Sequence, residues 1–151
     1  MTTPTAPRPA PPSATAATGT PGTELPERRF TLTRADLLRY AGASGDFNPI
    51  HYDERVAGAL GLPGVIAHGM LTMGLAATAV TDWFGPAAQV AEYETRFARP
   101  AVVPPGAGVE LVVSGRVDAV LDGARTRVVL TALCGGERVL ARARAVVVTG
   151  R

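Results

Sequence analysis

Two histidines occur in the chain, and the first closes a short motif that can perform acid–base chemistry. Residues 45–51 read Gly-Asp-Phe-Asn-Pro-Ile-His, so Asp46 precedes His51 by five positions. The Asn48-Pro49 pair predicts a turn, because proline fixes its own φ and keeps the residue before it out of the α region. Such a turn can hold a carboxylate and an imidazole toward one pocket, where histidine exchanges protons near neutral pH. An Asx turn alone is the alternative for Asp46, but it requires no histidine.

The second histidine, His68, stands where a loop enters an apolar helix. Residues 68–71 read His-Gly-Met-Leu. The first N–H groups of a helix have no partner inside it, so they suit an oxygen that gains negative charge. Gly69 has no side chain to keep a carbonyl group away from its N–H. We expect His68 to seat the helix entrance and Gly69 to bind substrate.

The elements that must position these residues follow from the spacing of apolar positions. Residues 1–23 are rich in Pro, Ala and Thr and predict a disordered tail, which leaves residues 24–151 as one domain. The first predicted elements are a strand over 29–32 and a helix that starts with a capping box at Thr33 and Asp36 and ends at Gly42 or Gly45. A short helix over 53–60 and a long helix over 69–83 follow. The remaining predicted strands are 91–98, 109–117 and a hairpin of 125–133 with 137–148 around Gly135-Gly136.

The long helix over 69–83 is apolar nearly all round and carries no charge before Asp82, so we expect it to be buried on every side. The strands around it predict an α+β domain, in which a largely antiparallel sheet of about five strands curls round one helix. A single sheet covers the helix only in part and leaves an open edge. We place Asp46 and His51 in a loop at the exposed rim of this domain.

Composition excludes several other classes of function. The cations are all arginine, and the net charge of +2 comes without a basic run, so we expect no nucleic-acid partner. No run of 18 apolar residues exists and the N-terminus lacks a secretory pattern, so we expect no membrane span and no export signal. The single cysteine, Cys134, cannot form an internal disulfide, which favours a cytoplasmic location and a buried, inert thiol.

The motifs resemble a known family. Residues 40–51, which read Tyr-Ala-Gly-Ala-Ser-Gly-Asp-Phe-Asn-Pro-Ile-His, and residues 67–70, which read Ala-His-Gly-Met, are similar to those of the MaoC-like, (R)-specific enoyl hydratases. Within that family the chain most resembles the catalytic subunit of the actinobacterial (3R)-hydroxyacyl-ACP dehydratase heterodimers. The similarity runs from about Leu25 to the C-terminus. It implies the hotdog fold, in which an antiparallel sheet wraps around a long central helix.

The resemblance also implies roles for the site residues. Asp46 and His51 position and activate the water that adds to the β-carbon of an enoyl thioester, or that leaves in the dehydration direction. The Gly69 N–H polarises the thioester carbonyl, and this stabilises the charge that develops on its oxygen by about 3 kcal/mol. Asn48 shapes the loop and is counted with Gly69 among the substrate-binding residues. The implied substrate is acyl-ACP or acyl-CoA in fatty-acid elongation. No cofactor is implied, and two histidines with one cysteine are a poor metal set.

One position bears on assembly. Homodimeric short-chain hydratases of the family often carry a serine on the buried helix, and the matching position here is Ala77. We therefore favour a heterodimer with a second hotdog subunit that lacks the motif and holds the acyl chain. A stand-alone homodimeric enoyl-CoA hydratase and a non-catalytic acyl-binding hotdog subunit are the alternatives. The intact pair of Asp46 and His51 speaks against the non-catalytic one.

Overall fold

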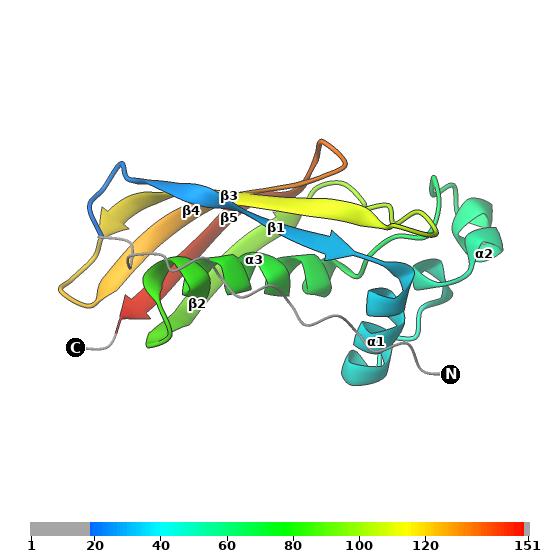
Figure 1. Cartoon of the computed structure of the whole chain (residues 1–151), viewed down its shortest axis with the longest axis horizontal. Helices are drawn as coiled ribbons and strands as arrows, with labels where there is room; N and C mark the ends of the chain where they lie inside the picture. The colour runs from blue at the N-terminus through cyan, green and yellow to red at the C-terminus, as the bar shows by residue number, and fades with distance from the viewer. Residues whose placement is uncertain (1–18, 150–151) are drawn as a thin grey trace.

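A computed structural model describes residues 19–149, which form one sheet wrapped around a long helix (Figure 1). The elements are β1 (Glu24–Leu32), α1 (Arg34–Ser44), the 3-10 turn η1 (Pro49–His51), α2 (Glu54–Ala59), α3 (Gly69–Phe84), β2 (Ala88–Phe97), β3 (Val109–Val120), β4 (Arg125–Cys134) and β5 (Glu137–Thr149). The strands pair antiparallel in the order β1-β3-β4-β5-β2. The predicted α+β class and hotdog fold are confirmed.

The sheet has one face turned to the core, and β4 shows why. Every second residue from Thr126 to Cys134 is buried, as the pleat of a strand with one covered face requires. Gly135 and Gly136 join β4 to β5 with φ values of 57° and 83°, the left-handed conformation that a tight hairpin turn needs. The predicted hairpin is therefore confirmed, and Cys134 is the buried thiol that we expected.

Helix α1 ends where the site begins. The predicted capping box is present at its start, where the Asp36 carboxylate accepts from Thr33 N–H at 2.9 Å and the Thr33 hydroxyl accepts from Asp36 N–H at 3.3 Å. At its other end Gly45, not Gly42, is the C-cap in the left-handed region, with φ 76°, and its N–H donates to Ala41 O. The left-handed cap turns the chain sharply, and Asp46 follows directly after it.

Helix α3 is covered on one side only. Its buried residues face the sheet, and the Trp83 ring packs so closely on Gly115 of β3 that a Cβ there would lie 2.9 Å from the ring. On the other side Met70 and Gly74 are exposed. The five strands of this chain thus cover the helix only in part, as predicted for a single sheet, and burial on every side stays a prediction about the assembled protein. None of the described helices is long and apolar enough to cross a bilayer.

Several boundaries differ from the predictions, and the start of β1 differs most. β1 starts at Glu24, five residues before the predicted strand, because the register shift between Leu25 and Arg28 interrupts the alternation there. The predicted disordered tail lies outside the described residues as far as residue 18. Beyond it the chain already follows β3, where Gly22 N–H donates to Val117 O at 2.8 Å.

Candidate active site

Residues 40–51, 66–72 and 97–101 meet at the start of α3. This is the end of the molecule that also carries α1 and α2 (Figure 1). A cavity of about 530 Å³ opens at this point. Asp46, His51, His68 and Gly69 all line it. The structure therefore brings both predicted catalytic residues and the predicted carbonyl-binding glycine into one cavity.

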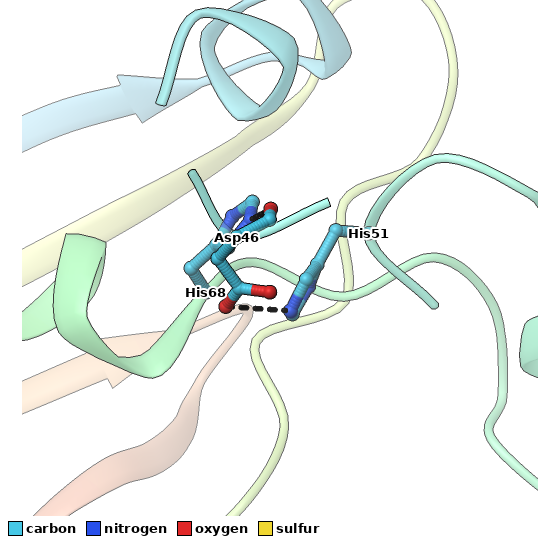
Figure 2. Close-up of side chains that lie close together, drawn as sticks. All are labelled: Asp46, His51 and His68. Atoms are coloured by element: carbon cyan, nitrogen blue, oxygen red, sulfur yellow. Dashed lines mark hydrogen bonds and ion pairs between the residues drawn. The ribbon is translucent and has the colours of Figure 1, made fainter. Parts of the chain in front are cut away.

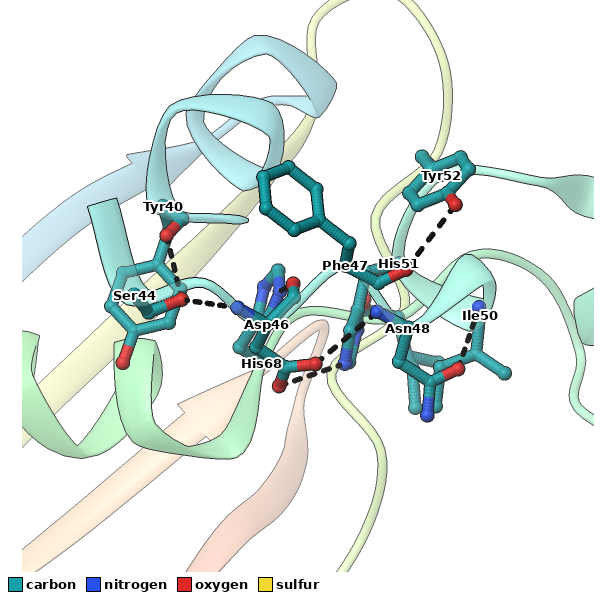
Figure 3. Close-up of polar contacts among 10 residues, drawn as sticks. Tyr40, Ser44, Asp46, Phe47, Asn48, Ile50, His51, Tyr52 and His68 are labelled. Atoms are coloured by element: carbon teal, nitrogen blue, oxygen red, sulfur yellow. Dashed lines mark hydrogen bonds and ion pairs between the residues drawn. The ribbon is translucent and has the colours of Figure 1, made fainter. Parts of the chain in front are cut away.

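The loop after α1 orients the Asp46 carboxylate by local hydrogen bonds. Asp46 N–H donates to Ser44 Oγ at 3.2 Å, and Asp46 Oδ1 accepts from Asn48 N–H at 3.2 Å (Figure 3). The second carboxylate oxygen, Oδ2, is left to face His51 (Figure 2). The Asp46 side chain is 53% exposed, as expected for a rim residue.

Asn48 shapes the loop, as the resemblance implies. Its Oδ1 accepts from Ile50 N–H at 3.3 Å, and its carbonyl oxygen accepts from His51 N–H at 3.1 Å. Pro49 follows in the first position of η1, where a missing N–H costs nothing. Asn48 is not among the residues that line the cavity. Its geometry supports the loop role, and its substrate-binding role stays a prediction.

His51 lies deeper than we expected. It is 7% exposed, so the expectation of a rim position is wrong for this residue. Turn η1 places the His51 ring next to the main chain of Ile66, whose carbonyl oxygen lies 2.8 Å from His51 Nδ1. A carbonyl oxygen only accepts hydrogen bonds, so Nδ1 carries the hydrogen and Nε2 of the neutral ring presents a lone pair.

The distance from His51 Nε2 to Asp46 Oδ2 is 3.9 Å (Figure 2). It exceeds the length of a hydrogen bond, so the two atoms are not directly bonded. Both atoms offer lone pairs to the gap between them. A water molecule in that gap can donate one hydrogen to each, which leaves its oxygen lone pairs free for a substrate.

His68 contacts both members of the pair. It is 2% exposed, its Nε2 lies 3.1 Å from the backbone oxygen of Asp46, and its ring stacks on the His51 ring with centroids 3.7 Å apart (Figure 3). We expected only that His68 would seat the helix entrance. The link to Asp46 spans 22 residues of sequence, and no local pattern predicts it.

Gly69 opens α3 at the cavity wall. Within the part of the chain that the structure describes, its N–H has no hydrogen-bond acceptor, and His68 provides no side-chain cap. The Phe97 ring packs against Gly69, because an added Cβ would lie 3.0 Å from its Cδ1 and Cε1 atoms. Phe97 and the neighbouring Met70, which are 50% and 56% exposed, add an apolar wall that sequence reasoning missed.

Asp46, His51 and His68 also form a cluster whose ligand atoms lie within 4.8 Å of one another, close enough to be a candidate metal site. One nitrogen of each ring already faces a carbonyl oxygen. The rings are stacked with an interplanar angle of 24°. An ion shared by both rings would lie out of their planes, where the nitrogen lone pairs do not point. The donor set suits proton transfer better than metal binding.

Two curated relatives are similar to this chain. It is 38% identical over 84 residues to 3-hydroxyacyl-thioester dehydratase X of Mycobacterium tuberculosis, over 56% of this chain and 29% of that protein. It is also 32% identical over 102 residues to the 3-oxo-4,17-pregnadiene-20-carboxyl-CoA hydratase beta subunit of the same organism, over 68% of this chain and 76% of that protein. The chain thus spans less than a third of the first relative's length.

Solved structures share the fold. The R-hydratase PhaJ1 from Pseudomonas aeruginosa superposes with a TM-score of 0.75 at 28% identity, over 87% of this chain and 83% of that one. A chain of the ChsH1-ChsH2 complex from Mycobacterium tuberculosis superposes with a TM-score of 0.73 at 26% identity, over 87% of this chain and 98% of that one. The family model of the MaoC-like domain matches residues 16–132, which include both motifs, residues 40–51 and 67–70. The chain belongs to the MaoC-like dehydratase family.

Proposed function

We propose that the chain is a hydro-lyase that interconverts trans-2-enoyl thioesters and (3R)-hydroxyacyl thioesters. One observation carries this proposal: His51 Nε2 and Asp46 Oδ2 face each other across 3.9 Å in a cavity that also holds the free N–H of Gly69. The pair suits one water molecule, and the N–H suits one carbonyl oxygen. Those are the two groups that hydration of an enoyl thioester must activate together.

In the hydration direction, water lies between the two acceptors. As its oxygen bonds to C3 of the enoyl group, His51 Nε2 accepts a proton from it, and the C2–C3 double-bond electrons move toward the thioester carbonyl. The Gly69 N–H stabilises the negative charge that develops on the carbonyl oxygen of the thioester. The proton then returns to C2 from the same pair, which balances the reaction. Because one pair serves both carbons, hydroxyl and hydrogen arrive on the same face of the double bond. Dehydration is the reverse.

The names of the relatives support the reaction class and the substrate class. One relative is a 3-hydroxyacyl-thioester dehydratase, another is the subunit of a CoA-thioester hydratase, and PhaJ1 is an R-hydratase. The (R) configuration of the product rests on this similarity and on the family motif. Met70 and Phe97 at the cavity wall provide apolar contact for an acyl or pantetheine chain. We propose acyl-CoA or acyl-ACP in fatty-acid elongation as the substrate.

One similar chain is part of the ChsH1-ChsH2 complex, and one curated relative is named as the beta subunit of a hydratase. We propose that this chain likewise pairs with a second hotdog subunit, and that the partner differs from it and lacks the Asp–His pair. The uncovered side of α3, at Met70 and Gly74, supports a partner of some kind. The preference for an unlike partner rests on Ala77, which is half-buried on α3 and does not line the cavity. A homodimeric hydratase is the alternative.

The test is turnover of defined thioesters. The purified chain, alone and with its hotdog partner, is mixed with crotonyl-CoA and with longer trans-2-enoyl thioesters on CoA and ACP. We expect the ultraviolet absorbance of the enoyl thioester to fall and the (3R)-hydroxyacyl product to form, as chiral chromatography would establish. The (S) product, or no turnover of any thioester with or without the partner, would contradict the proposal.

A further inference from the structure

His68 has no part in the hydration scheme, yet it is more deeply buried than either proposed catalytic residue. Its Nε2 lies 3.1 Å from the backbone oxygen of Asp46, and its ring lies against the His51 ring (Figure 3). The Tyr40 ring packs near it from α1, with centroids 4.8 Å apart. His68 is thus the one side chain that these contacts join to both members of the pair.

The bond to Asp46 fixes which nitrogen of His68 carries its hydrogen. The backbone oxygen accepts, so Nε2 donates and Nδ1 is left as a bare acceptor. Nδ1 is buried and has no hydrogen-bond partner among the described residues. An unpaired buried polar atom weakens a fold, and phenylalanine would fill similar space without one. Packing alone therefore does not account for a histidine at this position.

Asp46 depends on this bond for its place in the site. Its other hydrogen bonds, to Ser44 and Asn48, stay within two residues along the same loop. The bond from His68 ties the Asp46 main chain to the N-cap of α3, 22 residues further along the chain. Because the Asp46 side chain is exposed and packs little, the anchored main chain decides where its carboxylate lies relative to His51.

We propose that His68 is a positioning residue that sets the gap between Asp46 Oδ2 and His51 Nε2. Its Nε2–H holds the Asp46 main chain, and its ring face supports the His51 ring. This inference rests on the proposed hydration function, in which the gap holds the reacting water. A gap wider by about 1 Å would cost the water one of its two partners, and misplacement on that scale lowers rates by about 10²-fold.

His68→Phe separates positioning from packing. The variant keeps the ring on His51, removes the donor to Asp46 and removes the unpaired Nδ1. We expect kcat to fall by about 10²-fold with KM within a few-fold of wild type and a Tm equal to or above the wild-type value. His68→Gln places an amide donor near the Nε2 position without a ring, and His68→Leu provides neither feature. We expect the Gln variant to keep more activity than the Leu variant.

Nitrogen-15 NMR of the wild-type chain tests the bond independently of turnover. The chain has two histidines, so its four ring nitrogens can be assigned from His68→Phe alone. We expect hydrogen on Nε2 of His68 and on Nδ1 of His51. If wild type turns over no thioester, the proposed function fails while the NMR result still decides the bond. Hydrogen on Nδ1 of His68, or wild-type kcat in His68→Phe, would overturn the inference. If His68→Phe does not fold, equal kcat in the Gln and Leu variants would overturn it.

Discussion

The Nδ1 atom of His51 donates to the carbonyl oxygen of Ile66 at 2.8 Å, and this bond turns the other ring nitrogen toward Asp46. The imidazole therefore presents a base to the cavity without the carboxylate bonding to the ring. In many acid–base pairs the carboxylate orients the imidazole. Here a backbone carbonyl does that, which leaves Asp46 Oδ2 available to the water as a second acceptor.

We expect His51→Ala and Asp46→Asn each to lower kcat by about 10²–10⁴-fold, because each removes one acceptor of the reacting water. Steady-state kinetics with an enoyl thioester, alongside circular dichroism, checks this. Asp122→Asn is the matched control. Asp122 lies in the β3–β4 turn, where its Oδ1 accepts from Ala124 N–H, and asparagine keeps that oxygen. Near-wild-type kcat in a folded Asp46 or His51 variant would remove that residue from the mechanism.

Gly69→Ala tests access to the N–H at the start of α3. The new methyl group would meet the Phe97 ring at 3.0 Å. In the proposed mechanism it would also crowd the approach of the thioester carbonyl to the N–H. We expect kcat/KM to fall by about 10²-fold, in the range for a lost oxyanion donor. Gly58→Ala in α2 is the control, since nothing lies within 4 Å of an added Cβ there.

A double variant separates the two effects of that methyl group. Phe97→Ala removes the ring that the methyl group meets but leaves the carbonyl path blocked. We therefore expect Gly69→Ala with Phe97→Ala to remain slow relative to Phe97→Ala alone. Recovery in the double variant would mean that Gly69 serves the packing of Phe97 and not the substrate.

How far the sequence predicted the molecule depended on whether the signal was local. The capping box at Thr33 and the Gly135-Gly136 hairpin depend on neighbouring residues, and both are confirmed. The Asp46–His51 motif also located the cavity. The predicted exposure of His51 was wrong, and the bond from His68 to Asp46 was not predicted, because tertiary packing decides both. No periodicity in the sequence encodes a contact across 22 residues.

The capping box of α1 predicts acid sensitivity. Partial burial would raise the pKa of Asp36, but hydrogen bonds from Thr33 and attraction to Arg39 outweigh it and hold the pKa below the ordinary value. The carboxylate thus contributes stability above the ordinary aspartate pKa of about 3.9, and the contribution disappears as pH falls through the lower pKa of the folded state. We expect Asp36→Asn to lower the free energy of unfolding at pH 7 by about 0.3–1.5 kcal/mol.

Urea unfolding as a function of pH checks this expectation. The difference between wild type and Asp36→Asn should shrink toward zero in acid, where the wild-type carboxyl is protonated as well. Thr33→Ser keeps the capping hydroxyl and should follow the wild-type curve. A difference that stays constant down to the lowest pH at which the protein folds would show that the charge of Asp36 is irrelevant.

Tyr93 predicts a loss of stability in base. Burial raises the pKa of its hydroxyl to about 12, and that oxygen has no hydrogen-bond partner among the described residues. The unfolded chain releases this proton near the ordinary tyrosine pKa of about 10, so the contribution of Tyr93 is complete below that pH and is lost as pH rises to about 12. We expect Tyr93→Phe to lose less of its free energy of unfolding above pH ~10 than wild type does. At neutral pH its free energy of unfolding should equal or exceed the wild-type value. Identical alkaline unfolding curves would contradict this.

The last prediction concerns the uncovered side of α3. Gly74 lies there in mid-helix, exposed, with nothing within 4 Å of an added Cβ, so Gly74→Arg should leave the fold of a single chain intact. If a second hotdog subunit covers this side, the arginine would bury a charge in an apolar contact, which is costly without a partner of opposite charge. We expect sedimentation to show an assembled wild type and a dissociated Gly74→Arg.

Gly58→Arg is the matched control, because Gly58 is likewise helical, exposed and open around its Cβ position, but lies on α2. It should assemble like wild type. A wild-type chain that is monomeric and fully active on its own would refute the assembly, whereas a fully active homodimer would refute only the unlike partner. Co-expression with a hotdog subunit that lacks the Asp–His pair decides between these outcomes, because a true partner should raise kcat/KM and join wild type but not Gly74→Arg.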